Sequence, residues 1–204
     1  MRSTIACLIL LAGVAMPVLA QPSIEITPTI GYVFGGSFDE LIAPGLGDAS
    51  VDIEDSESYG LIFDIGNERN AFEFTWMHQS TDLSTNSEAF PLFDYASDNF
   101  QFGYLYYFSD GATKPFMNFS LGWTDFDIGG QDGDSRFSFA IGAGVSHYFN
   151  DRFGLRFQAR WIPTYVNTDE AYIVCDPFGY CWVVGDDNYL YQTEVSLGLI
   201  IKIR

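Results

Sequence analysis

Alternation of apolar and polar residues with a period of two is the feature that most constrains how this chain can fold. Successive side chains of a β-strand point to opposite faces, so this period predicts strands rather than helices. The pattern recurs in eight segments: 24–35, 58–65, 71–80, 98–108, 115–126, 137–149, 153–165 and 189–203. After residue 20, no apolar run reaches the roughly 18 residues of a membrane-spanning helix.

The connections between these segments alternate in length. The short ones are 66–69, 109–114 and 150–151, and the long ones are 36–57, 81–97, 127–135 and 166–188. Strands joined by short and long connections in turn are typical of an up-and-down antiparallel sheet. We therefore expect an all-β fold, an eight-stranded antiparallel barrel, with all the long connections at one end.

The two faces of the predicted strands differ in an unusual way. One face is almost wholly aliphatic and aromatic, and the other is rich in Gly, Ser, Thr, Gln and isolated charges. Glycine weakens a strand, but it makes room in a lumen crowded with a few long polar side chains. A bulky face turned toward lipid also explains an aromatic content of 17%, because aromatic girdles mark both interfaces of membrane barrels. This favours a transmembrane barrel over the alternative, a soluble barrel with an apolar interior.

The N-terminus has the features of a secretory signal peptide. Arg2 precedes an apolar run, and Val18 and Ala20 place small residues at −3 and −1 of a cleavage site after Ala20. We therefore expect residues 1–20 to be removed and residues 21–204 to form one barrel domain outside the cytoplasm. Cys7 would leave with the signal peptide.

The two remaining cysteines, Cys175 and Cys181, lie in the stretch IVCDPFGYCWVV. Asp176-Pro177-Phe178-Gly179 is typical of a type I turn, and a left-handed Gly179 would set Cys175 opposite Cys181. A zinc site would need two further ligands, and the chain has two histidines, His78 and His147. The spacing also excludes a C-x-x-C redox pair. We expect a disulfide that closes a hairpin tip.

The sequence resembles the small eight-stranded outer-membrane barrels, the group that contains the OmpA transmembrane domain and OmpX. The resemblance covers the whole mature chain and is strongest in RFSFAIGAGVSHYFNDRFGLRFQARWIP, residues 136–163. The ending SLGLIIKIR resembles the C-terminal assembly signal of that group, with Ser196, Gly198, Ile201 and Ile203 in the signal positions, although it lacks a terminal aromatic residue. The resemblance implies an outer-membrane protein with extracellular long loops and periplasmic short turns. It also implies contact with lipopolysaccharide and with the outer-membrane assembly machinery.

The net charge of −18 is concentrated in the predicted long connections. Of the 27 acidic residues, 20 fall in or beside them, and none of these stretches contains Lys or Arg. Nucleic acid is therefore excluded as a partner. Carboxylates are the ligands that Ca²⁺ prefers, so the acids are either a solvated surface or a weak calcium site. The best candidates for such a site are Asp125, Asp127, Asp132 and Asp134, beside glycines that let the loop fold back.

The remaining charges are predicted to point into the lumen. They are Glu25, Asp64, Glu73 and Glu194, with Arg156, Arg160 and Lys202 as their counterparts. Because an unpaired buried charge is costly, we expect ion pairs, in particular Arg160 with Glu194 and Glu25 with Lys202. Eight strands enclose a space about wide enough for side chains alone, which argues against a conducting pore.

No catalytic site is expected. His78 and Ser80 have the His-x-Ser spacing of lipid A deacylases, but Leu92 occupies the position twelve residues on where that family has its acid. The sequence therefore predicts a monomeric, non-enzymatic outer-membrane barrel without a cofactor. Its role would be structural, or it would be a surface-interaction role in adhesion or immune evasion toward host or cell-surface ligands. A lipid A-modifying enzyme and a soluble periplasmic ligand-binding barrel are the remaining alternatives.

Overall fold

The computed structural model describes residues 22–43, 47–85, 93–128, 131–166, 172–175, 181–184 and 189–203. These residues form an all-β structure of twelve strands. Eight of them make the barrel: β1 (Ser23–Phe34), β4 (Ser56–Gly66), β5 (Asn70–Thr85), β6 (Phe93–Tyr107), β7 (Thr113–Ile128), β8 (Gln131–Tyr148), β9 (Phe153–Tyr165) and β12 (Tyr189–Lys202). No helix in the described ranges is long and apolar enough to cross a membrane.

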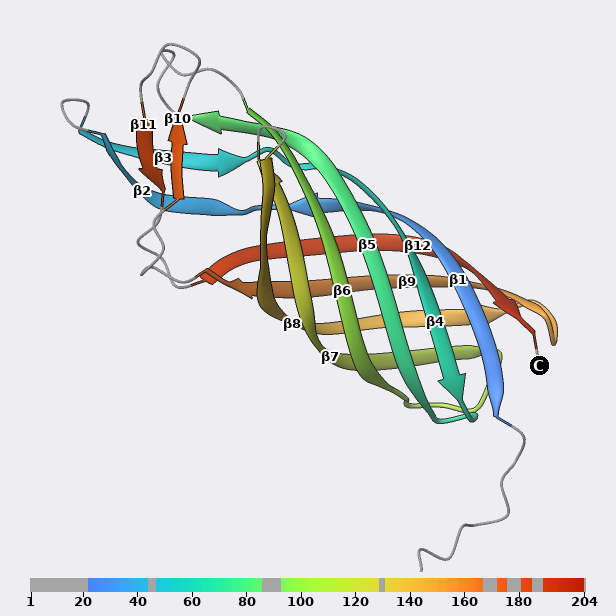
Figure 1. Cartoon of the computed structure of the whole chain (residues 1–204). Coiled ribbons are helices and arrows are strands. Elements are labelled where there is room, and N and C mark those ends of the chain that lie inside the picture. The colour runs from blue at the N-terminus through green and yellow to red at the C-terminus, as the bar shows by residue number, and fades with distance from the viewer. Residues whose placement is uncertain are drawn as a thin grey trace, which may run out of the picture.

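The barrel is closed and every pairing within it is antiparallel. The strand order is β5-β4-β1-β12-β9-β8-β7-β6, and β6 pairs again with β5 to complete the ring. First and last strands meet, with Glu25 opposite Lys202 and Phe34 opposite Thr193. The predicted fold, an eight-stranded antiparallel barrel, is therefore confirmed (Figure 1).

The register fixes how strongly the strands tilt. Glu25 on β1 pairs directly with Lys202 on β12. When the paired residues are followed from Glu25 in the other direction, from β4 round to β9, the row reaches β12 at Gln192 instead. The two positions are ten residues apart (202 − 192). The row passes through Asp64, Glu73, Gly103, Ser120, Ala140 and Ile162. A shift of this size over eight strands corresponds to a tilt of about 40°.

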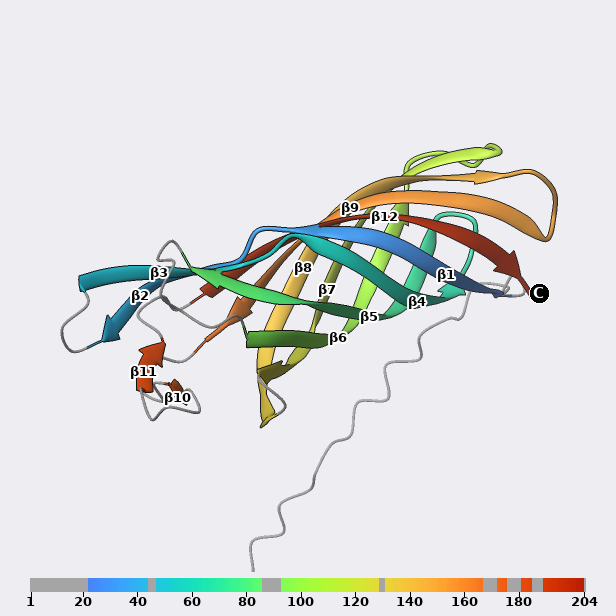
Figure 2. The same ribbon diagram turned by 90° about the horizontal axis from the view of Figure 1, so that it is seen from above.

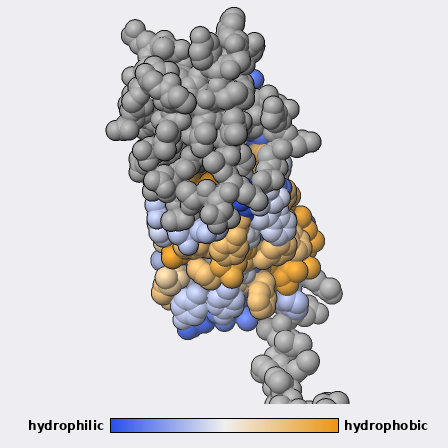
Figure 3. All heavy atoms as spheres, turned by 60° about the vertical axis from the view of Figure 1, so that its left-hand side comes forward, coloured by the Kyte–Doolittle hydropathy of each residue, from blue (hydrophilic) through white to orange (hydrophobic). Residues whose placement is uncertain are grey.

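The exposure of the side chains shows which face of each strand is apolar. The outward face carries Ile30, Phe72 and many other exposed large apolar residues; Ile30 is 68% exposed and Phe72 is 73% exposed. The inward face buries charged side chains, with Arg156 1% exposed and Arg160 2% exposed. Apolar residues form a band across the wall, with hydrophilic residues beside it at the end with the short turns (Figure 3). This distribution is the reverse of that in a water-soluble barrel.

Several predicted boundaries are wrong, because the barrel strands continue into the expected loops. Strands β5 to β8 extend through most of 81–97 and 127–135, where the sequence is acidic and no longer alternates. Outward positions of these extensions carry polar residues such as Asp82 and Asp94, both exposed, so the outward face is no longer apolar while the backbone ladder persists. The strand pattern was visible in the sequence only where one face is apolar.

Two further hairpins lie in the predicted first and fourth long connections. β2 (Ser37–Ala43) pairs with β3 (Gly47–Ile53), and β10 (Tyr172–Cys175) pairs with β11 (Cys181–Val184). β3 adds to the end of β5, and β11 adds to β2, so the two hairpins continue the barrel wall. They project from the end of the barrel opposite the C-terminus (Figures 1 and 2). This end is called the long-loop end below, and the other is called the short-turn end.

The corner between β1 and β2 needs two glycines. Gly35 and Gly36 have φ angles of +76° and +119°, which favour glycine. The carboxylate of Asp55 accepts the N–H of Gly35 at 2.9 Å, and the N–H of Ile53 donates to the carbonyl of Gly36 at 2.8 Å. These contacts join the base of the first hairpin to the rim of the barrel.

Candidate functional site

Arg156 is the centre of the polar lumen in the half nearer the short-turn end. Its Nη1 donates to Asp64 Oδ2 at 3.0 Å, its Nη2 pairs with Glu73, and its Nε donates to Gln158 Oε1 at 2.9 Å. The guanidinium also lies 4.4 Å from the ring centroid of Phe116. Asp64 and Glu73 are cross-strand neighbours, so one arginine compensates two adjacent buried carboxylates.

Arg160 and Glu194 form a second ion pair in the lumen, nearer the long-loop end than Arg156. They face each other across β9 and β12, with Arg160 Nη2 2.6 Å and Nε 2.7 Å from Glu194 Oε2. Both side chains are 2% exposed. The hydroxyl of Ser58 donates to the second carboxylate oxygen of Glu194 at 3.4 Å. The charges are thus desolvated and paired, as a buried carboxylate requires.

Amides and hydroxyls occupy the lumen toward the long-loop end. Gln192 donates to Gln79 at 3.0 Å, and Asn99 donates to Thr124 at 2.7 Å. Beside them, an apolar cluster of Val33, Met77, Ala140 and Ile162 is also buried inside the barrel. The interior is a packed core of alternating polar and apolar groups.

Glycine makes room for these side chains, as the composition of the inward face suggested. A Cβ at Gly142 would lie 2.3 Å from Asn118 Oδ1 and 2.8 Å from Arg160 Cγ. Asn118 in turn donates to Glu73 at 2.7 Å. A larger residue at position 142 would therefore displace Asn118, which contacts Glu73 beside Arg156, and Arg160 itself.

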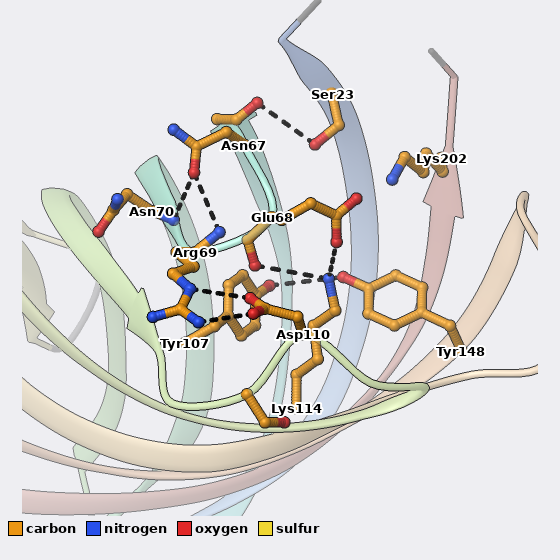
Figure 4. Close-up of polar contacts among 12 residues, drawn as sticks. Ser23, Asn67, Glu68, Arg69, Asn70, Tyr107, Asp110, Lys114, Tyr148 and Lys202 are labelled. Atoms are coloured by element: carbon orange, nitrogen blue, oxygen red, sulfur yellow. Dashed lines mark hydrogen bonds and ion pairs between the residues drawn. The ribbon is translucent and has the colours of Figure 1, made fainter. Parts of the chain in front are cut away.

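A smaller polar pocket opens at the short-turn end (Figure 4). Lys202 lies 3.7 Å from Glu25, and the hydroxyl of Tyr148 donates to Glu25 at 2.8 Å. Lys114 pairs with Glu68 and lies between the rings of Tyr107 and Tyr148, 5.5 Å and 5.3 Å from their centroids. The pocket has room for about one water molecule.

Lys114 and Glu68 were not predicted as members of the lumen network. With Lys114, which is 8% exposed, and its partner Glu68, the network has five acids and four bases rather than four acids and three bases. Lys114 was assigned to the short connection 109–114, as its last residue before the strand expected from 115. Its place in the alternation with Phe116 and Asn118 was the signal that could have assigned it to the lumen.

Two ion pairs connect the short-turn regions, beyond the apolar band at the short-turn end. Arg69 in the β4–β5 turn pairs with Asp110 in the β6–β7 turn, with 2.6 Å between Nη2 and Oδ2. The guanidinium of Arg69 lowers the pKa of Asp110 below its ordinary value, mainly through this hydrogen bond. The ammonium of Lys114 lowers the pKa of Glu68 in the same way. Both carboxylates are therefore held in the ionised form.

A second polar cluster lies on the outward face at the long-loop edge of the apolar band. His78 Nδ1 lies 3.1 Å from Asp98 Oδ1, and Trp76 Nε1 donates to the same oxygen at 2.9 Å. His78 and Asp98 are cross-strand neighbours on β5 and β6. The position twelve residues beyond Ser80 is Leu92, so no acid was expected beside His78. Asp98 was not predicted as its partner, because the contact depends on the register of the next strand.

The predicted calcium ligands are only partly described. Asp125 accepts a hydrogen bond from Ser135, and the backbone register places Asp127 opposite Asp132. The side chains of Asp132 and Asp134 lie outside the described part. Among the described residues, no group of three or more His, Cys, Asp or Glu side chains could hold a metal.

The backbone register also places Cys175 opposite Cys181 at the end of the β10–β11 hairpin. Their side chains lie outside the described part. The residues of the expected assembly signal end β12: Ser196 and Gly198 are buried inside the barrel, and Ile203 is exposed. Ile201 pairs with Ile26 on β1 and Phe153 on β9, at the seam that closes the barrel.

No protein-family model and no curated protein sequence matches the chain. Solved structures do match it. OprG, an outer-membrane protein of Pseudomonas aeruginosa, is 12% identical with a TM-score of 0.62, over 88% of this chain and 95% of OprG. Neisserial surface protein A is 15% identical with a TM-score of 0.56, over 88% of this chain and 97% of that protein. The chain has the fold of the small eight-stranded outer-membrane barrels.

Proposed function

We propose that this protein is an integral outer-membrane barrel whose wall faces lipid and whose lumen is a structural core. The observation that carries the proposal is the inverted distribution of side chains. Phe72 and Ile30 are largely exposed, whereas Arg156 and Arg160 are buried. Exposed apolar surface on this scale is costly in water and favourable in a bilayer.

The packed lumen supports a scaffold role rather than a channel. Arg156 and Arg160 each reach acids on other strands and fill the interior, and Val33, Met77, Ala140 and Ile162 pack between the polar groups. A polar ligand or a hydrated ion would have to displace at least one buried ion pair, which costs several kcal/mol.

In this proposal, the acidic long-loop end carries the biological role. That role is either structural, at the cell surface, or the binding of host or cell-surface ligands. The first and fourth long connections supply β2, β3, β10 and β11, which form one sheet beyond the barrel. Within this proposal, residues 1–20 are a removable signal, Cys175 and Cys181 form a disulfide, and the assembly machinery recognises the end of β12. The acids meet lipopolysaccharide through weakly bound Ca²⁺, and the protein acts as a non-enzymatic monomer.

Site-directed labelling tests the orientation. Single cysteines at Ala49, in β3, and at Thr113, at the start of β7, are placed in a background with Cys175→Ser and Cys181→Ser. A membrane-impermeant maleimide should label Ala49→Cys on intact cells and Thr113→Cys only after the outer membrane is opened. Labelling of both on intact cells would contradict the proposed topology.

Deletion of the loops tests the surface role. A variant without 36–57 and 166–188, each replaced by a short Gly-Ser turn, should keep heat-modifiable migration on gels because the eight barrel strands remain, except for Ser56 and Glu57 at the start of β4. Loss of cell or ligand binding by this folded variant supports a surface-interaction role. Unchanged binding supports a purely structural one.

A further inference from the structure

The acids of the lumen network outnumber the bases in the half nearer the short-turn end. Arg160 and Glu194 balance each other toward the long-loop end, which leaves four acids against three bases. The acids are Glu25, Asp64, Glu68 and Glu73, and the bases are Lys114, Arg156 and Lys202. One negative charge therefore has no counterpart among the described residues of this half. A buried charge is stable only when it is paired or bound to a cation.

The contacts locate the excess charge at Asp64. Its Oδ2 accepts a hydrogen bond from Arg156 Nη1 at 3.0 Å, but Arg156 is shared with Glu73 through its Nη2. Asp64 Oδ1 has no hydrogen-bond partner among the described residues, although Asp64 is only 3% exposed. An ionised carboxylate accepts hydrogen bonds and donates none, so Oδ1 requires a donor or a cation.

Glu25 adds a second carboxylate beside Asp64. The two residues are cross-strand neighbours on β1 and β4, and both are buried inside the barrel. Side chains directly opposite each other on paired strands have Cβ atoms about 5 Å apart. The ion pair of Glu25 is loose, with 3.7 Å between its Oε1 and Lys202 Nζ, and Tyr148 donates to its other oxygen at 2.8 Å. Two carboxylates at this separation repel each other unless positive charge lies near both.

The polar pocket at the short-turn end joins these groups to a neutral oxygen. Glu25, Asp64 and Ser23 all line it, and it has room for about one water molecule. Ser23 lies at the start of β1 beside the pocket (Figure 4). Its hydroxyl donates to the carbonyl of Gly66 at 3.5 Å, so the lone pairs of its oxygen remain available. A dehydrated Na⁺ ion is no larger than a water molecule and binds oxygen atoms of these kinds.

The donor set selects a monovalent ion. A divalent metal site would need more carboxylate or imidazole ligands, and no group of three or more His, Cys, Asp or Glu in the described ranges could hold one. A single excess negative charge is also balanced by a single positive charge. We propose that this pocket binds one monovalent cation, such as Na⁺, between Asp64 Oδ1 and the Glu25 carboxylate, with Ser23 Oγ as a neutral ligand. The ion connects β1 to β4 beside the seam where β1 meets β12.

This site goes beyond the proposed surface and scaffold roles, and either can fail alone. Loop deletion and cysteine labelling do not report on cation binding at the short-turn end. The chain also offers a matched control in Asp151, which is exposed in the turn between β8 and β9 and does not line the pocket. Asp151→Asn removes the same charge at the same end of the barrel as Asp64→Asn.

The test measures urea unfolding of the full mature chain, refolded into lipid vesicles, at a series of Na⁺ concentrations. Choline chloride keeps the ionic strength constant, because choline is too large for the pocket, and EDTA removes Ca²⁺. The variants are Asp64→Asn and Glu25→Gln, with Asp151→Asn as the control. Heat-modifiable migration checks that each variant is folded. Sodium NMR on the same proteins in micelles detects bound Na⁺ without unfolding.

For one site that exists only in the folded protein, each tenfold rise in Na⁺ above the dissociation constant should raise the folded-to-unfolded ratio about tenfold. The wild type and Asp151→Asn should show this dependence and broaden the sodium resonance. Asp64→Asn and Glu25→Gln should lose the dependence, because either change removes the excess charge and one ligand. Two results would overturn the proposal. One is a folded wild type whose stability does not change with Na⁺. The other is a dependence that survives in both folded pocket variants, because Na⁺ would then act at the acidic loops or as a general salt.

Discussion

Arg160 and Glu194 face each other across β9 and β12 inside the barrel, with 2.6 Å between Arg160 Nη2 and Glu194 Oε2 and both side chains 2% exposed. Removing either partner leaves the other as an uncompensated charge in the lumen. Arg160→Ala should therefore lower the free energy of unfolding by about 3–5 kcal/mol. Adding Glu194→Gln should recover part of the loss, as measured by urea unfolding in lipid vesicles. An additive double-mutant cycle would show that the two residues are not coupled.

Arg156 should matter more than Arg160. Its guanidinium contacts both Asp64 and Glu73, so Arg156→Ala leaves two adjacent carboxylates without a cation. We expect a larger loss of unfolding free energy than for Arg160→Ala, and a partial recovery when Glu73→Gln is added. The same urea titrations rank the variants. Equal losses for the two arginine variants would contradict the compensation of two acids by Arg156.

The ion pairs between the short turns should make stability fall in acid. The pKa values of Asp110 and Glu68 are lowered in the folded protein, so their contributions are complete above the unfolded pKa values of about 4. They are lost as the pH falls through the lower folded values. Lys114→Met should therefore lower the urea midpoint at pH 7 more than at pH 3. A difference from wild type that is the same at both pH values would rule out the contribution of Glu68.

The register of the β10–β11 hairpin leads to a prediction for its cysteines. A disulfide between Cys175 and Cys181 closes a very short loop, which stabilises by roughly 2–3 kcal/mol in the loop-closure model. Reduction should make residues 166–188 easier to cut by protease and leave the barrel intact. Cys175→Ser with Cys181→Ser should behave like the reduced protein and show no response to reductant. Loss of heat-modifiable migration on reduction would contradict this local role.

Weak calcium binding at the third long connection is the remaining test of the acidic surface. We expect Ca²⁺ to bind Asp125, Asp127, Asp132 and Asp134 with a dissociation constant of about 10⁻⁴–10⁻³ M. Calorimetry on the refolded barrel should detect it, and Asp132→Asn with Asp134→Asn should abolish the heat. Absence of heat at millimolar Ca²⁺ would mean that the acids are only a solvated surface.

Much of the barrel could be predicted from the sequence because a lipid-facing wall and a polar lumen give a strict period of two. Arg160 and Glu194 could be paired because both belong to regular segments near the end of the chain. Lys114 was missed because it was assigned to the short connection 109–114, whereas β7 begins at Thr113. β2 was missed because SFDELIA carries no alternation, and β3 was missed because GDASVDI, which alternates, lies within an acidic connection. The β10–β11 hairpin was expected from the turn between Cys175 and Cys181, but its pairing with β2 was not. The contact of His78 with Asp98 depends on the β5–β6 register, which the sequence does not specify.

The central claim is that the exposed aromatic wall contacts lipid, and tryptophan quenching tests it most directly. Single-tryptophan variants that retain Trp76, Trp123 or Trp161 are refolded into vesicles, and the other tryptophans are replaced by Phe. Brominated acyl chains should quench all three, and aqueous iodide should quench them weakly, because their rings lie on the outward, apolar face of their strands. Strong quenching by iodide with no effect of brominated lipid, in a barrel shown to be folded, would contradict the account.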